Sequence, residues 1–143
     1  MSSLVEILDA LAAQIETQLA SKVENLAVTG RLVPNPTPPA IDMYPADPFT
    51  EAFTYGPNPL LFFTVRARVT TADQQGGQEL LLSMMDSEEE TSMEKAILSS
   101  RTLGGKVTKA SVVAGPSSYG VFVTPQGDVG SLLGCTWTVQ VTP

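Results

Sequence analysis

LLFFTVRARVTT, residues 60–71, alternates apolar and polar side chains along its length. One parity gives an apolar face and the other a mostly polar face: Leu61, Phe63, Val65, Ala67 and Val69 against Thr64, Arg66, Arg68 and Thr70. This alternation predicts a β-strand with one face toward the core. Leu60 and Phe62 add apolar side chains to the second face, so we expect partial cover there too.

The chain before this strand predicts a helix and a further strand. Residues 3–20 place apolar side chains at three- and four-residue steps, which is typical of an amphipathic helix. Ser3 and Glu6 fit a capping box at its start. NLAVTGRLV, residues 25–33, then predicts a strand in which Gly30 is a bulge or a point of close approach.

The chain after the strand predicts two helices and then strands. GQELLLSMMD indicates one helix, and a second begins at about Ser92, where Thr91 and Glu94 fit another capping box. KVTKASVVA, VFVTP and LLGCTWTVQV follow as strands, with a turn expected at GPSSYG. We therefore expect one α+β domain over residues 1–143. Its antiparallel or mixed β-sheet would carry the N-terminal helix and the helical pair on one face.

Prolines crowd one segment between the predicted strands. Eight of the eleven prolines lie between Pro34 and Pro59. Proline has no backbone N–H and a fixed φ, so the segment is a poor central strand or helix. We expect a loop or arm at about 34–59, with at most a short extended piece near 40–44 on a sheet edge. Long loops in small domains tend to be functional.

Composition narrows the classes of function. The 143 residues carry a net charge of −7, one cysteine and no histidine. So acidic a chain has no general attraction for nucleic-acid phosphates. The lack of histidine removes the commonest general base and metal ligand. No run is long enough to span a membrane, and the acidic N-terminus is unlike a signal peptide, so we expect a cytoplasmic product.

No motif predicts catalysis. RTLGGKVTKASVV, residues 101–113, lacks the spacing of a phosphate-binding loop and has the order helix, glycines, strand, so Gly104 or Gly105 is interpreted as a helix C-cap. Cys135 alternates with apolar residues and is expected in the core. The acidic run at 86–90 lacks EF-hand spacing and favours a solvated loop. No spacing singles out a carboxylate pair. We expect no enzyme activity and neither metal nor cofactor.

With its parts in this order, the chain resembles the tail terminator, or tail-completion, proteins of long-tailed bacteriophages. The resemblance rests on LVEILDALAAQIETQL, GRLVPNPTPPAIDMYP, LLFFTVRARVTT and SMEKAILSSRTLGGKVTKASVV. It implies a homo-oligomeric ring, typically a hexamer, that caps the tail tube and stops its polymerisation. The ring also offers the surface to which the head connector docks. It would be assembled in the bacterial cytoplasm and reside in the virion, with genomic DNA only passing through.

Three regions are the predicted contacts with other subunits, the tail tube protein or the head-completion protein. They are the proline-rich segment, the two arginines of the central strand and the acidic loop: Pro34, Pro36, Pro38, Pro39, Tyr44, Phe49, Phe53, Tyr55, Arg66, Arg68, Asp86, Glu88, Glu89 and Glu90. The arginines either bind a partner's carboxylates or are solvated on the sheet face. Alternatives are another phage neck or minor tail protein, and a small acidic hydrolase or ligand-binding domain.

Overall fold

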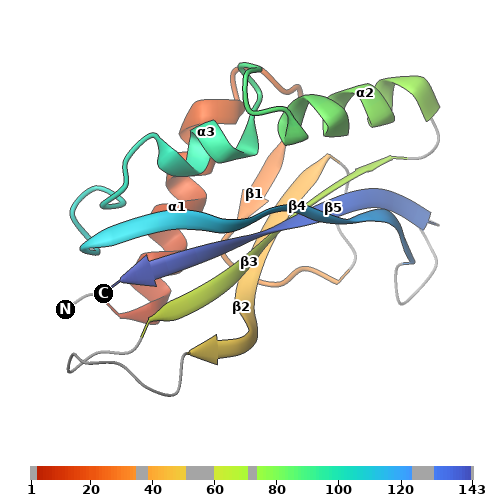
Figure 1. Ribbon diagram of the computed structural model, residues 1–143. Coiled ribbons are helices and arrows are strands. Elements are labelled where there is room, and N and C mark those ends of the chain that lie inside the picture. The colour runs from red at the N-terminus through yellow and green to blue at the C-terminus, as the bar shows by residue number, and fades with distance from the viewer. Residues whose placement is uncertain (1–2, 35–38, 51–59, 71–73, 124–130, 143) are drawn as a thin grey trace.

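The computed structural model describes residues 3–34, 39–50, 60–70, 74–123 and 131–142 (Figure 1). Their elements follow the order α1 (Leu4–Leu19), β1 (Ala27–Thr29), β2 (Ala40–Thr50), β3 (Leu61–Thr70), α2 (Gln74–Met85), α3 (Met93–Leu98), β4 (Lys109–Val123) and β5 (Ser131–Thr142). The strands form one sheet in the order β1-β2-β3-β5-β4. β1 runs parallel to β2, whereas the other neighbours are antiparallel. The predicted α+β class with a mixed sheet is confirmed.

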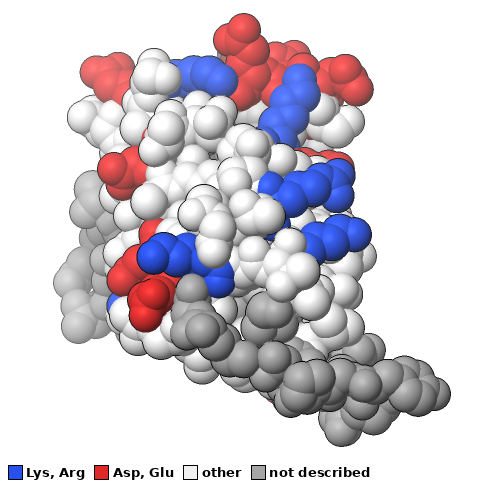
Figure 2. Space-filling view, turned by 90° about the vertical axis from the view of Figure 1, so that its left-hand side faces the viewer, with Lys and Arg blue, Asp and Glu red and all other residues white. Residues whose placement is uncertain are grey.

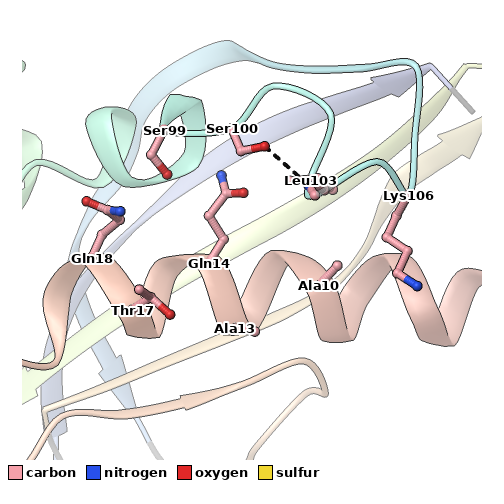
Figure 3. A pocket seen from close by; sticks show the side chains of 10 residues that line it. Ala10, Ala13, Gln14, Thr17, Gln18, Ser99, Ser100, Leu103 and Lys106 are labelled. Atoms are coloured by element: carbon pink, nitrogen blue, oxygen red, sulfur yellow. Dashed lines mark hydrogen bonds between the residues drawn. The ribbon is translucent and has the colours of Figure 1, made fainter.

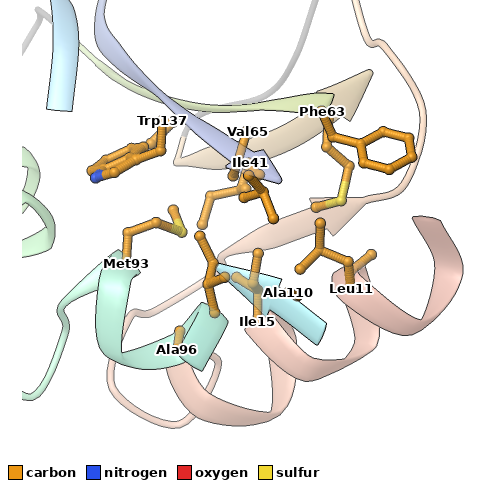
Figure 4. Close-up of a cluster of buried hydrophobic side chains, with 14 of the residues drawn as sticks. Leu11, Ile15, Ile41, Phe63, Val65, Met93, Ala96, Ala110 and Trp137 are labelled. Atoms are coloured by element: carbon orange, nitrogen blue, oxygen red, sulfur yellow. The ribbon is translucent and has the colours of Figure 1, made fainter. Parts of the chain in front are cut away.

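The core lies between one face of the sheet and the helices. Figure 4 shows α1 and α3 on the same side, with Leu11 and Ile15 of α1 and Met93 of α3 directed toward the strands. Phe63 of β3 and Trp137 of β5 are fully buried among them, as the alternation predicts. Each such side chain contributes about 1.5–3 kcal/mol through removal from water. This apolar layer holds the helices on the sheet.

α1 begins as the capping box predicts. The Ser3 hydroxyl accepts a hydrogen bond from the Glu6 backbone N–H at 3.2 Å and donates one to the Glu6 carboxylate at 3.2 Å. The buried side of the helix begins at Ile7, and Leu4 is exposed. β1 is shorter than the predicted strand at 25–33 because the chain turns away at Gly30. A Cβ there would lie 3.0 Å from the Leu8 carbonyl oxygen, so the predicted close approach is confirmed.

β2 corrects the expectation of a loop or arm throughout 34–59. It spans Ala40–Thr50 and includes Pro45 and Pro48. β1 pairs only with residues 40–42, so the outer side of β2 beyond Asp42 is a sheet edge, where a missing N–H breaks no ladder. The ladder with β3 also shifts between Pro45 and Thr50. Residues 35–38 and 51–59 lie outside the described part of the chain.

β4 corrects the turn expected at GPSSYG. The segment belongs to one 15-residue strand that pairs with β5 along its length. Its register shifts three times, between Val112 and Ala114, Ala114 and Ser117, and Ser117 and Gly120. Each shift is a bulge. Because β4 is an edge strand, only one of its sides carries a ladder, and Pro116, which has no N–H, can be accommodated there.

The connection from α3 to β4 corrects two local predictions. The N-cap of α3 is Ser92, whose hydroxyl accepts from the Lys95 N–H at 3.2 Å, because the Thr91 hydroxyl is bonded to Ser83 at 2.7 Å. α3 ends at Leu98, so the glycine pair is no helix C-cap. Gly104 and Gly105 do have positive φ, at 70° and 89°. They form a separate turn, in which the Gly105 N–H donates to the Thr102 carbonyl at 3.0 Å.

The acidic loop at 86–90, between α2 and α3, is exposed, as predicted. Two lysines hold its backbone: Lys22 Nζ donates to the Glu90 carbonyl at 3.0 Å, and Lys95 Nζ donates to the Glu88 carbonyl at 2.7 Å. Figure 2 shows acidic side chains gathered at the top of the molecule, where Figure 1 places this connection. Among the described residues, no helix is long and apolar enough to cross a membrane.

Candidate functional site: an arginine cluster and an unpaired edge strand

The arginines of β3 meet a carboxylate of their own chain. Asp42 lies opposite Arg66 in the β2–β3 register. Arg66 donates through Nε to Asp42 Oδ1 at 3.0 Å and through Nη2 to Asp42 Oδ2 at 2.6 Å. Arg68 Nη2 lies 3.2 Å from the same Oδ2. Two guanidinium groups therefore share one carboxylate on the face of the sheet opposite the helices. We call these three residues the arginine cluster.

The arginine cluster holds the backbone of the segment that follows β1. The Val33 N–H donates to Asp42 Oδ2 at 3.0 Å, and the Val33 carbonyl accepts from Arg66 and Arg68. Both backbone polar groups of Val33 are thus satisfied by side chains. The segment leaves β1 and lies across β2 and β3 on the open face of the sheet. The cluster therefore fixes the point from which the proline-rich segment starts.

Burial sets the electrostatics of the arginine cluster. Asp42 is 1% exposed and Arg68 3% exposed. Burial lowers the pKa of Arg68 from its ordinary value; the charge of Asp42 opposes that shift, and the charge of Arg66 adds to it. Burial acts in the same direction on Arg66, but the hydrogen bond and charge of Asp42 outweigh it, and the pKa is raised. Arg68 Nε is buried with no hydrogen-bond partner in the described structure.

Neither sequence interpretation of the arginines matches this arrangement. They are not solvated: Arg68 is buried and Arg66 is partly buried, with its guanidinium 5.2 Å from the centre of the Tyr44 ring. The carboxylate that they bind belongs to the same chain, because Asp42 shares their sheet face. Asp42 was not among the residues predicted from the sequence. It could have been found as a lone acid in AIDMYP, at the parity opposite the buried Ile41 and Met43.

The second candidate surface is the outer edge of β4. No strand of the described structure pairs with that side of β4, which is the last strand of the sheet. Three large apolar side chains of this strand are exposed, Val113 by 50%, Tyr119 by 44% and Val121 by 62%. We call these residues the β4 strip. An unpaired strand edge with apolar side chains is a template for contact with another chain.

The other predicted contact residues that the structure describes belong to elements other than β4. Pro34 is exposed, and Pro39 and Tyr44 are partly buried. Phe49 packs edge-to-face on Phe63, with ring centres 5.4 Å apart, so it belongs largely to the fold. The acidic side chains of the exposed 86–90 loop form a separate surface region between α2 and α3. The predicted contacts Pro36, Pro38, Phe53 and Tyr55 lie outside the described residues.

A groove of about 440 Å³ runs between α1 and the chain that leaves α3 (Figure 3). Hydroxyl, amide and small side chains line it, together with Leu103 and Lys106. Gln14 spans its base and donates through Nε2 to the Ala96 and Ile97 carbonyls, at 3.1 Å and 2.6 Å. These carbonyls belong to the last turn of α3, where the Ala96 carbonyl also accepts from the Ser99 N–H and hydroxyl, so Gln14 fastens α3 to α1.

Two further candidates for chemistry remain, a cysteine and groups of possible metal ligands. Cys135 is fully buried, as predicted, and burial raises the pKa of its thiol to about 12. Within the described ranges, no group of three or more His, Cys, Asp or Glu residues is placed to hold a metal ion. No family model, curated protein or solved structure matches the chain.

Proposed function

We propose that the chain is a tail terminator of a long-tailed bacteriophage. Copies of it would form a closed ring, a hexamer in the first test, on the end of the tail tube. The ring would stop tube polymerisation and present the surface for the head connector. The proposal extends the sequence resemblance. Within the structure, the observation that carries it is the unpaired β4 edge with its exposed apolar side chains.

A ring subunit needs a surface that remains uncovered until it meets its neighbour. β4 is such a surface, because its 15 residues pair on one side only and the β4 strip faces solvent. Burial of these side chains against a neighbour would contribute about 25 cal/mol for each Å² of apolar area removed from water. The edge therefore supports an oligomeric function rather than a monomeric one.

The arginine cluster supports a second part of the proposal. It fixes Val33, the residue before Pro34, on the open face of the sheet. Proline restricts its own backbone, and laying such a segment on a neighbour costs less conformational entropy than ordering a flexible loop. Pro34, at the start of this segment, is therefore a proposed contact with an adjacent subunit or with the tail tube.

The negative charge of the subunit would affect how DNA passes through such a ring. The net charge of −7 and the exposed acidic loop give the chain little attraction for phosphates. A lumen lined by acids would repel the genome and let it pass without adhesion. Basic side chains on the lumen of an assembled ring would contradict this part of the proposal.

The function is tested on purified protein and on particles. Native mass spectrometry should detect a closed ring, and the ring should bind the open ends of tail tubes. Electron microscopy of phage made without the gene should show overlong tails. Normal tails beside unjoined heads would instead identify a head-completion protein. A chain that stays monomeric at every concentration and binds no tube end would refute the proposal.

A further inference from the structure

The basic residues of this chain gather in one stretch of the sequence. Residues 95–127 contain four of the eight Lys and Arg residues and none of the 15 Asp and Glu residues. In a chain with a net charge of −7, this stretch is where an acidic partner meets the least repulsion. It includes the connection from α3 to β4, at the left of Figure 1.

Two of these bases form an exposed pair at the start of β4. Arg101 and Lys109 are both exposed. The Ala110 N–H donates to the Arg101 carbonyl at 2.6 Å, so the backbones of Arg101 and Lys109 lie next to each other. Within the described ranges, neither side chain forms an ion pair. We call these two residues the basic surface.

The other two bases of the stretch are already bound within the chain. Lys106 Nζ lies 3.9 Å from Glu6 Oε2, and Lys95 donates to the Glu88 carbonyl. Figure 2 views the molecule from the left-hand side of Figure 1 and shows basic side chains below the acidic ones at the top. The basic surface is therefore defined by the two bases without a carboxylate partner in the described structure.

The acidic loop at 86–90 offers the opposite charge. Its four carboxylates are exposed, and in the part of the chain that the structure describes none of them binds a basic side chain: Asp86, Glu88, Glu89 and Glu90. Lys22 and Lys95 bind its peptide oxygens instead. The loop precedes α3 and Arg101 follows it. A helix of six residues, about 9 Å long, thus separates the loop from the basic surface in one copy.

We propose that the acidic loop of one copy binds the basic surface of a second copy of this chain. The inference rests on the proposed ring and supplies the charged part of its subunit contact. Lys109 is the first residue of β4, whose edge carries the proposed contact. Each copy would give its loop to one neighbour and its basic surface to the other. Arg101 can bind a carboxylate through two N–H groups, and the Lys109 ammonium can bind another.

Nucleic acid is the other anion that exposed bases attract, and the charges favour it less. Its affinity grows with the number of phosphates that the protein neutralises, and the basic surface has only two bases. A duplex carries one charge for about every 1.7 Å of its axis, so one laid over the basic surface would also lie beside the four carboxylates of the acidic loop. A five-residue loop brings its carboxylates to one place.

The test exchanges the charges of the two regions. The first variant, Arg101→Glu with Lys109→Glu, makes the basic surface acidic. The second makes the loop basic and keeps Asp86, whose carboxylate accepts the backbone N–H of residue 88: Glu88→Lys, Glu89→Lys and Glu90→Lys. The third carries all five changes. The matched control reverses three exposed acids outside the loop: Glu16→Lys, Glu24→Lys and Asp47→Lys.

Sedimentation equilibrium at low salt measures the dissociation constant of self-association. The first and second variants should each raise it about 10-fold or more, because like charges then face each other. The third should return it to within about 3-fold of the unaltered chain, because the charges are again complementary. The control should not raise it. For the unaltered chain, an increase from about 0.1 M to about 1 M NaCl should raise it about 10-fold, because the Debye length falls from about 10 Å to about 3 Å.

Circular dichroism checks that each variant is folded. If the chain with five changes is unfolded, an equimolar mixture of the first and second variants makes the same test, because each altered region then meets an opposite charge on the other variant. Four results would overturn the inference: an unchanged constant in the first or second variant, no recovery with the charges exchanged, weakening by the control, or no effect of salt. Binding of a labelled oligonucleotide that the first variant abolishes would also overturn it and assign the basic surface to nucleic acid.

The same measurements separate this inference from the proposed function. If the unaltered chain forms rings that cap tubes and the first two variants do so equally well, the surfaces are wrong and the function stands. If the unaltered chain self-associates but never binds tube ends, the function fails, and the charge exchange still decides the surfaces. A chain that never self-associates refutes both.

Discussion

Replacement of Asp42 by asparagine should destabilise the fold strongly. Both carboxylate oxygens accept hydrogen bonds, Oδ1 from Arg66 and Oδ2 from Arg66 and Val33, with Arg68 close to Oδ2. An amide has one acceptor oxygen, so its nitrogen would face a donor in either orientation. The change also leaves two buried or partly buried guanidinium groups without a counter-charge. Loss of one partner of a buried ion pair costs about 3–5 kcal/mol.

Urea unfolding followed by circular dichroism measures the effect. With a slope of about 1–3 kcal/mol per M, a loss of 3 kcal/mol or more lowers the midpoint by about 1 M or more. The control is Asp9→Asn, the same chemical change in the exposed pair with Arg31, whose side chains are 61% and 51% exposed. That pair should contribute about 1 kcal/mol or less. Equal midpoints for the two variants, with unchanged slopes, would refute the role given to Asp42.

Further predictions concern the thiol, a helix contact and a cap. A disulfide reagent at pH 8 should label Cys135 only as fast as the chain unfolds; rapid labelling would contradict its burial. Its folded pKa of about 12 exceeds the reference 9.0, so its contribution to stability is complete below pH 9 and falls as pH rises toward 12. Gly77→Ala should lower the melting temperature, because a Cβ would lie 2.3 Å from the Thr70 carbonyl oxygen, whereas Gly115→Ala, with no atom within 4 Å, should not. Gln14→Leu should lower the free energy of unfolding by about 1–3 kcal/mol and speed amide exchange in α3. Unchanged amide exchange would contradict the contact of Gln14 with the end of α3.

Periodic burial explains which elements could be predicted from the sequence. β3 and β5 alternate at period two, and α1 and α3 place apolar residues on one side, so their type and buried faces follow from local pattern. The α+β class follows from their order. The exact N-cap of α3 was predicted one residue early, because Thr91 and Ser92 are both good caps. Only the tertiary bond from Thr91 to Ser83 distinguishes them.

Long-range contacts explain what could not be predicted. Proline at positions 45 and 48 argues against a strand until it is known that β1 stops at Thr29 and leaves that side of β2 free. The three bulges of β4 likewise depend on pairing with β5. The arginine cluster needs Asp42 and Arg66 to be in register, which is a property of the β2–β3 ladder. The residue types at the candidate surfaces were visible in the sequence, but their partners were not.

The bulges of β4 have a consequence for the solubility of the free subunit. A long, regular, apolar edge strand invites identical strands to add without limit, as in a fibril. Three bulges within one hairpin strand increase its twist and spoil the even spacing of its outward N–H and C=O groups. Pro116 removes one donor altogether. A protein proposed to end the growth of another polymer thus carries, in its own backbone, a barrier to open-ended growth of its sheet.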